Sequence, residues 1–527
     1  MALREAPAAT LPAAVASAGF VRVLVRADGD GLAAGGLLAA ALAELDTPFQ
    51  VTPTRSAAER EGALAEREAL AAGDVILALG PVGDDADALE ARLDADGVDS
   101  IGSTEGFDTA DGSETVDASE NADATEIGTP VDGADAGPTE RFGDGPIPFA
   151  EPAIDRPASR LAWDLATRLG ADPDPVVALA GGIAAGFGLA SSALAPMRRA
   201  AEQGELIDAR PGLGIPTGDP VEGLAHSGLV HAPWSGDTAA VGRALEGIIA
   251  EDGRVGNGPE GADGADGPGN TEDPGSDESP GREDGPGSGE GSGSDDGTTV
   301  ARLDEETGRR LASAVAVDAL SAGGTPASAA AAIEVVLQPA TTPGGPLATV
   351  EGLADVLGAV ARDAPGIGIA LAAGRGGHDG ALSAWRTRGP VLHAAVRESA
   401  LRRSDGIAVL TVDPDTLDAP GGPGAVPGVD VARVAAAYRA EEPIVVAVVP
   451  DVPGEPAGGD GAVTGDDADP AAHTIVAVAT DGDLLPFDPA PIAQTVGAAW
   501  DRGARWARFA VDPDDADDLI DAIGGAT

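Results

Sequence analysis

The stretch from residue 15 to residue 98 alternates strand-like and helix-like patterns, and this rhythm constrains the fold more than any other feature. The apolar runs "FVRVLVRA", "FQVTPT" and "DVILALG" alternate with "GLAAGGLLAAALAEL" and "SAAEREGALAEREALAA", which have helical composition. Strands that alternate with helices form parallel sheets with helices packed on their faces. The sequence therefore predicts an α/β fold that begins with a parallel sheet.

The rest of the chain predicts a helical connector and a second, smaller α/β domain. Residues 155–250 are mostly helical in pattern, whereas residues 301–527 open with helices and continue with the strand-like runs "GIGIALAAG", "GIAVLTVD", "PIVVAVVP" and "HTIVAVAT". We therefore expect an N-terminal domain over residues 15–251 and a C-terminal domain over residues 301–527, joined by residues 252–299.

Three acidic segments interrupt this pattern, at about residues 100–147, 252–299 and 453–471. They consist largely of Gly, Pro, Ser, Asp and Glu, with few large apolar side chains. Such segments bury too little apolar surface to offset the entropy of ordering, and they exceed the usual length of connections in a compact fold. We expect all three to be disordered or loosely ordered.

The charge balance indicates adaptation to high salt rather than a particular partner. The chain has 88 acidic and 32 basic residues, a net charge of −56, and every basic residue is Arg. This self-repulsion weakens a compact state in dilute salt, but at molar ionic strength the Debye length falls to about 3 Å. We interpret the composition as halophilic.

Composition also excludes several classes of site and location. With no Cys, the chain has no disulfide, zinc–thiolate site or cysteine nucleophile. The uncharged run at residues 175–197 is rich in Ala and Gly, which favours a buried helix over a membrane span. The first residues resemble a short helix more than a signal peptide. We therefore expect a cytoplasmic protein without a membrane partner.

The first strand ends in two carboxylates that are suited to a divalent cation. Asp28 and Asp30 follow "VRVLVR" directly, and ligands of parallel α/β sheets bind at the carboxyl ends of strands. Carboxylate oxygens are preferred by Mg²⁺ and Mn²⁺. Asp28 and Asp30 are therefore candidate metal ligands, although "DGDG" in so acidic a chain is also compatible with a simple turn.

The same stretch resembles the first motif of the DHH phosphoesterase superfamily, which includes RecJ-type single-strand exonucleases. The family pattern is His-x-Asp-x-Asp-Gly, and "RADGDG" places Arg26 where the family has its histidine. A Gly-Gly-His sequence at Gly376, Gly377 and His378 matches the family's C-terminal motif. The resemblance implies a DHH-type N-terminal domain, a C-terminal domain that contacts substrate or nucleic acid at this loop, and Mn or Mg as the metal.

The other catalytic motifs of the family are missing. Ala78 stands where the second motif has an aspartate, and no histidine precedes His226, so the Asp-His-His motif is absent. The family's fourth aspartate, expected after an apolar helix like residues 176–188, has no acidic counterpart in "ALAGGIAAGFG". Two-metal hydrolysis needs ions about 4 Å apart, each with several ligands, which Asp28 and Asp30 alone cannot supply.

Other side chains could complete the site only if the fold brings them to Asp28 and Asp30. The candidates are Asp84, Asp85, His226 and His231. For the two histidines we favour the simpler alternative of a loop or packed turn beside Trp234.

Arginines gather in the segment from residue 375 to residue 403, against the acidic trend of the chain. Arginine grooves with aromatic platforms bind single strands without sequence preference. The candidate nucleic-acid-binding residues are Arg375, Gly376, Gly377, His378, Arg386, Arg388, Arg397, Arg402 and Arg403. The alternative is that these arginines pair with the protein's own carboxylates. A second group, Arg502, Arg505 and Arg508, has helical spacing beside Trp500 and Trp506, and we interpret it as mostly structural.

Three functions remain open at this stage. The resemblance favours a RecJ-like DNA replication or repair factor with a degenerate nuclease site, which binds single-stranded DNA or a replisome partner such as GINS. The alternative is an active metal-dependent single-stranded-DNA exonuclease with a rearranged site on Asp28 and Asp30. A third possibility is an α/β protein that binds a nucleotide at the "DGDG" turn.

Overall fold

The computed structural model describes ten ranges of the chain. They are residues 11–65, 74–79, 99–101, 156–255, 305–321, 325–404, 406–413, 426–453, 472–482 and 484–527. Apart from a few residues at their ends, the three acidic segments lie outside these ranges, so their disorder stays a prediction. The first residues of the expected linker at 252 belong to a helix, α9 (Thr238–Val255).

The N-terminal sheet is parallel, as the alternating pattern predicted. Its strand order is β2-β1-β3-β4, and each neighbouring pair is parallel. The strands are β1 (Val21–Arg26), β2 (Phe49–Thr54), β3 (Val75–Leu79) and β4 (Asp99–Ile101), and the accompanying helices are α1 (Leu11–Ala16), α2 (Gly29–Glu44) and α3 (Ala57–Ala65). The expected α/β class is therefore confirmed.

Helix α2 is the centre of a helical layer beside this sheet. Its Ala, Gly and Leu side chains are buried almost all round, which suits a helix with neighbours on every side. Gly36 lies so close to Ala372 that an added Cβ would come within 2.3 Å of the Ala372 Cβ. The neighbours of α2 include α5 (Ala158–Arg168), α6 (Pro175–Ala184), α12 (Val350–Val360) and α13 (Pro365–Ala372).

The apolar run at residues 175–197 folds as a buried helix, as predicted. It divides into α6, a 3-10 turn and the start of α7 (Ala195–Gln203), and Gly186 with φ +96° stands at the break. In the described ranges, no helix combines the length with the apolarity that a membrane crossing requires.

The C-terminal sheet is mixed and covered on both faces. Its order is β11-β12-β10-β9-β8-β7, and only the β8–β9 pair is parallel. Alternate β9 side chains enter different cores, since Val446 and Val448 pack on one face and Ala447 and Val449 on the other. The elements are β7 (Ala400–Ser404), β8 (Ile407–Thr411), β9 (Ile444–Pro453), β10 (Ala472–Thr480), β11 (Ala499–Arg502), β12 (Trp506–Val511), α15 (Gly428–Tyr438), α16 (Pro489–Val496) and α17 (Ala516–Ala526).

Two local predictions are wrong. The run "GIGIALAAG" is helix α13, because Pro365 begins a helix at its first turn and a short apolar run does not distinguish helix from strand. Arg502, Arg505 and Arg508 do not lie on a helix, although their spacing is helical. Their segment forms the antiparallel strands β11 and β12 and the turn between them.

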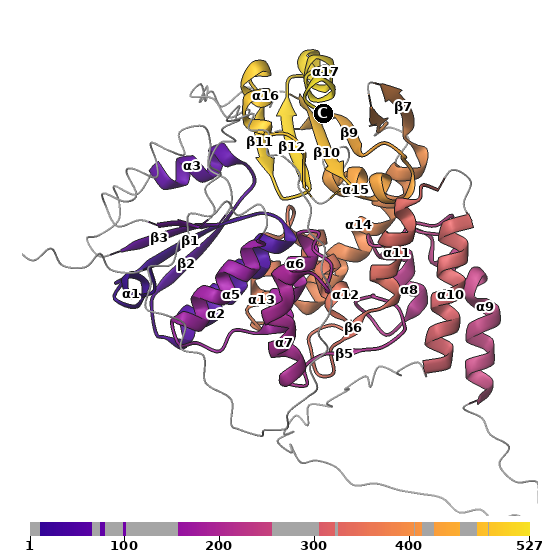
Figure 1. Ribbon diagram of the computed structural model, residues 1–527, viewed down its shortest axis with the longest axis horizontal. Coiled ribbons are helices and arrows are strands. Elements are labelled where there is room, and N and C mark those ends of the chain that lie inside the picture. The colour runs from indigo at the N-terminus through magenta and orange to yellow at the C-terminus, as the bar shows by residue number, and fades with distance from the viewer. Residues whose placement is uncertain are drawn as a thin grey trace, which may run out of the picture.

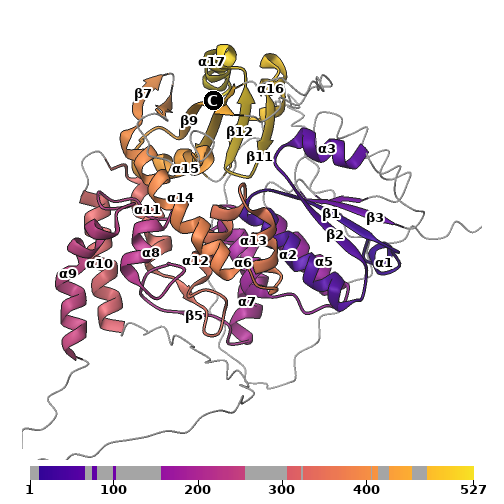
Figure 2. The same ribbon diagram turned by 180° about the vertical axis from the view of Figure 1, so that it is seen from behind.

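Figure 1 shows the N-terminal sheet on one side, the C-terminal sheet above, and the helical layer joining them; Figure 2 shows the same arrangement from behind. Helices α9 and α10 stand at the far side from the N-terminal sheet. The remaining elements are β5 (Asp208–Ala209), β6 (Ala340–Thr341), α8 (Pro220–His226), α10 (Glu305–Ser321), α11 (Ser328–Leu337) and α14 (His378–Glu398).

Candidate functional site

Asp28 and Asp30 lie together at the carboxyl end of β1, and their oxygens accept hydrogen bonds from backbone N–H groups. Asp28 is the N-cap of α2, since its Oδ1 accepts from the Gly31 N–H at 2.7 Å. Asp30 is 1% exposed, and its Oδ2 and Oδ1 accept from the N–H groups of Ala158 and Ser159 at 2.7 and 2.9 Å. Asp30 thus binds the start of helix α5.

The Arg26 guanidinium lies against both carboxylates. Its Nη2 is 2.9 Å from Asp28 Oδ2 and 3.5 Å from Asp30 Oδ2, and its Nε donates to Asp28 Oδ2 at 3.0 Å. Burial lowers the pKa of Arg26, but the charges of Asp28, Asp30 and Asp501 outweigh it and raise the pKa above its usual value. Burial, with a further contribution from Asp28, raises the pKa of Asp30 to about 6, against the opposing effect of Arg26.

Arg26 also connects the two sheets. Its Nη1 donates to the backbone oxygen of Arg502 in β11 at 3.2 Å, and its guanidinium carbon lies 6.0 Å from the centre of the Trp506 ring. A second connection joins Arg60 of α3 to Asp501 of β11, with Nη2 2.9 Å from Oδ1 and the Arg60 side chain fully buried. These contacts join segments more than 400 residues apart, and no local pattern in the sequence indicated them.

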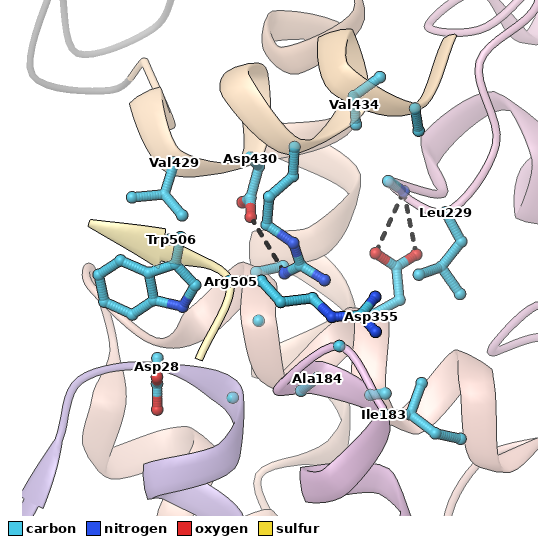
Figure 3. Close-up of a pocket in the computed structure, with 18 of the residues that line it drawn as sticks. Asp28, Ile183, Ala184, Leu229, Asp355, Val429, Asp430, Val434, Arg505 and Trp506 are labelled. Carbon is cyan, nitrogen blue, oxygen red and sulfur yellow. Dashed lines mark hydrogen bonds and ion pairs between the residues drawn. The ribbon is translucent and has the colours of Figure 1, made fainter. Parts of the chain in front are cut away.

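A pocket of about 650 Å³ lies next to these residues, between the two sheets and the helical layer. Figure 3 shows Asp28 at one side of it and the Arg505 side chain crossing between Asp430 and Ala184. Arg505 packs on Gly186, where an added Cβ would lie 2.8 Å from the Arg505 Cδ. Leu229, Val335 and Val434 form an apolar wall of the pocket.

The charged residues of this lining are unusual for so acidic a chain. Six arginines stand against five aspartates there, whereas the whole chain has 32 basic and 88 acidic residues. The arginines are Arg55, Arg362, Arg388, Arg433, Arg505 and Arg508, and the aspartates are Asp28, Asp355, Asp430, Asp481 and Asp501. The lining therefore lacks the acidic excess of the rest of the chain, and it repels a ligand that carries negative charge less than the remaining surface does.

Asp355 is a buried carboxylate in this pocket that sequence reasoning missed. It accepts from the Trp385 Nε1–H at 2.9 Å and from the Gly228 N–H at 3.1 Å. Burial raises its pKa to about 6. Its position as the one acidic residue of the stretch "GLADVLGAV", residues 352–360, was the available signal.

Of the side chains proposed to complete a metal site, the structure brings only His226 to the pocket. The His226 ring packs on Trp385 at 5.4 Å between ring centres. His231 lies elsewhere, with its Nδ1 3.0 Å from His393 Nδ1. Asp84 and Asp85 lie outside the described residues. Within the described ranges, no three His, Asp or Glu side chains converge in a way that could hold a metal ion.

His231 and His393 form a stacked pair in the interior. His393 Nε2 lies 3.0 Å from the backbone oxygen of Ser227, to which it donates, so its Nδ1 accepts and His231 Nδ1 donates. Burial, with Arg397 and Arg439 nearby, lowers the pKa of His231 to about 4. The expected alternative of a packed turn agrees with this environment and with the burial of Trp234.

Most of the candidate arginines between residues 375 and 403 contact the protein itself. Arg386 pairs with Glu222 at 2.6 Å, Arg403 with Glu442 at 2.6 Å, and Arg388 with Asp430, and the Arg397 Nη1 donates to the Ser235 oxygen at 2.5 Å. These contacts favour pairing with the protein's own carboxylates for Arg386, Arg388 and Arg403, whereas Arg397 contacts a backbone oxygen. Arg388 is the one member of the candidate set among the described lining residues of the pocket.

The Gly-Gly-His loop is exposed and lies between α13 and α14. Gly376 and Gly377 have φ values of +101° and +90°, which favour glycine. His378 is the first residue of α14 and 46% exposed on its side chain, and Arg375 and Arg402 are also exposed. The loop is not part of the pocket lining in the described residues.

Comparison with known proteins gives one relative in sequence and several in structure. No family model matches the chain. An uncharacterized protein of Haloarcula marismortui is 39% identical over 295 residues, which cover 56% of this chain and 61% of the relative. The match thus spans about three fifths of the relative's length.

Among solved structures, CDC45 from Entamoeba histolytica aligns with a TM-score of 0.50 at 9% identity, covering 98% of this chain and 97% of CDC45. RecJ from Thermus thermophilus in complex with Mn²⁺ aligns with a TM-score of 0.36 at 15% identity, covering 97% of this chain and 52% of RecJ. The structural neighbours of the chain thus include RecJ exonucleases, the group that the motifs predicted, and CDC45, whose likeness establishes the fold alone.

Proposed function

We propose that this chain is a RecJ-like DNA replication or repair protein that binds single-stranded DNA in the pocket between its two sheets and does not hydrolyse it. The observation that carries the proposal is the composition of the pocket beside the carboxylates. Asp28 and Asp30 are engaged by protein donors, and the adjacent pocket combines arginines, among them Arg388 and Arg433 paired with Asp430, with an apolar wall. The arginines suit the phosphate groups of a single strand, and the apolar wall suits its bases.

The proposal shifts the strand-binding surface from the segment at 375–403 toward the pocket. Arg386, Arg397 and Arg403 contact protein groups away from the pocket lining, whereas Arg388, which pairs with Asp430, and Arg505 lie in that lining. Arg375, Gly376, Gly377, His378 and Arg402 remain exposed candidates for a contact with the strand outside the pocket.

A replisome partner such as GINS is part of the same proposal. Its support is the resemblance of the two motifs to RecJ-like proteins and the CDC45-like fold. The acid-rich composition and the Haloarcula relative support a halophilic archaeal origin. If the exonuclease alternative holds instead, Asp28 and Asp30 would bind Mn²⁺ or Mg²⁺, the ions in the RecJ structures.

The test uses end-labelled single strands with the full chain, in molar KCl with Mn²⁺. We expect retention of the strand without cleavage. Replacing Arg505 by Gln removes a charge from the pocket and should weaken binding about tenfold and lower the slope of log K against log salt by about one. The matched control is Arg243→Gln, which removes an exposed arginine of α9 and should leave binding unchanged.

Two results would contradict the proposal. Cleavage that disappears in Asp28→Asn/Asp30→Asn would establish the exonuclease alternative. Equal strand affinity for the Arg505 and Arg243 variants would place the strand outside the pocket, and a parallel His378→Ala variant would then test the Gly-Gly-His loop.

A further inference from the structure

Arg26 occupies the position in the motif where a metal ligand is expected, and it brings a positive charge of its own. The side chain is 12% exposed, and its guanidinium contacts Asp28 at 2.9 Å and Asp30 at 3.5 Å. A divalent ion at a pair of carboxylates serves to neutralise them, and here a covalently attached cation already does so.

The carboxylates of Asp28 and Asp30 are not suited to bind a divalent ion while Arg26 lies against them. All four oxygens have an N–H donor, from Arg26 and Gly31 on Asp28 and from Ala158 and Ser159 on Asp30. A second cation between the two groups would lie within a few ångströms of the guanidinium and be repelled by it.

The backbone is closely packed where Gly29 meets Ala184 and Gly358, although these residues also line the pocket. An added Cβ on Gly29 would lie 2.7 Å from the Ala184 Cβ and 3.1 Å from the Gly358 nitrogen. Ala184 ends α6, the apolar helix after which the family resemblance implies a further aspartate, and neither α6 nor the residues up to 188 carry an acidic side chain. In the described ranges no third acidic or histidine side chain joins the pair.

Arg26 does more than neutralise the pair, because it joins two parts of the fold. The guanidinium belongs to β1 and donates to the Arg502 oxygen of β11, beside the buried Arg60–Asp501 pair. A cation at this point therefore holds the N-terminal and C-terminal sheets together.

We infer that Arg26 is the resident cation of this site, which takes the place of a divalent metal and makes the joint between the two sheets independent of metal. The inference goes beyond the proposed function, since it concerns what stabilises the site rather than what the pocket binds. Binding of single strands in the pocket is compatible with either outcome.

The test measures the unfolding midpoint of the full chain in molar KCl, with EDTA or with Mn²⁺. The variants are Arg26→Gln, Asp28→Asn/Asp30→Asn, and the triple variant that combines all three changes. The acidic surface binds Mn²⁺ non-specifically in every variant, so the Asp28/Asp30 variant supplies the baseline. Titration calorimetry of Mn²⁺ into the same proteins gives an independent readout of site-specific binding.

We expect Mn²⁺ to shift the unfolding midpoint of the native chain no more than it shifts that of the Asp28→Asn/Asp30→Asn variant. Arg26→Gln should lower the midpoint on the order of 5 °C in EDTA, because it leaves two carboxylates without a cation. The triple variant should recover part of that loss. A saturable Mn²⁺ stabilisation of the native chain that the Asp28/Asp30 variant lacks would overturn the inference, and so would an unchanged midpoint in Arg26→Gln. If Arg26→Gln does not fold, the inference is tested by comparing the Mn²⁺ response of the native chain with that of the Asp28/Asp30 variant.

Discussion

Replacing Arg60 by Met is expected to lower the free energy of unfolding by about 3–5 kcal/mol. Arg60 is fully buried, and its Nη2 lies 2.9 Å from Asp501 Oδ1 while its Nη1 donates to the Thr54 hydroxyl at 2.7 Å. The substitution preserves most of the side-chain volume but leaves the Asp501 carboxylate buried without its cation. Denaturant unfolding in molar KCl measures the effect.

A double-mutant cycle separates the lost ion pair from lost packing. Asp501→Asn removes the orphaned charge while it keeps an acceptor for the Arg502 N–H, so Arg60→Met/Asp501→Asn should be more stable than Arg60→Met alone. Arg243→Met, at an exposed site, should change stability by less than about 0.5 kcal/mol. A loss below about 1 kcal/mol in Arg60→Met would mean that this pair does not hold the two sheets together.

Replacing Glu351 by Gln is expected to stabilise the protein on the order of 2–3 kcal/mol at about pH 8 and to have little effect below about pH 4.5. Glu351 is 1% exposed, and its oxygens accept from the Ala340 N–H at 3.1 and 3.3 Å. Burial raises the pKa of Glu351 to about 7, well above the usual value of a glutamate side chain. A carboxyl group with a raised pKa binds more protons in the folded state. Its contribution to stability is therefore present below the unfolded pKa and is lost as pH rises through the folded pKa.

The control for this prediction is Glu334→Gln, which removes one charge from an exposed position on α11. Both variants change the net charge equally, so general charge repulsion cancels in the comparison. Asp30 and Asp355, whose pKa values burial also raises to about 6, are retained in both. Denaturant unfolding between about pH 4 and pH 8 at constant molar KCl measures the difference. Parallel pH curves for the two variants would contradict a buried, proton-binding Glu351.

Local patterns were sufficient for the N-terminal sheet and misleading for part of the C-terminal half. The strands β1, β2 and β3 alternate with helices in the predicted order, because a strand–helix rhythm admits few arrangements other than a parallel sheet. The run "GIGIALAAG" became helix α13 instead of a strand. Its length and apolar composition fit either element, and packing against α2 accompanies the helical form.

The candidate site likewise depends partly on local sequence and partly on contacts between segments far apart in the chain. The sequence by itself determined that Asp28 and Asp30 end a strand and begin a helix, that Arg26 stands in place of a histidine, and that the chain carries a large acidic excess. Only the tertiary structure decided that Arg26 lies against both carboxylates and reaches β11, that Arg388 pairs with Asp430, and that Asp355 lines the pocket. The physical reason is distance along the chain: hydrogen bonding and periodicity within an element depend on near neighbours, whereas the partner of a buried charge is set by which distant elements pack beside it.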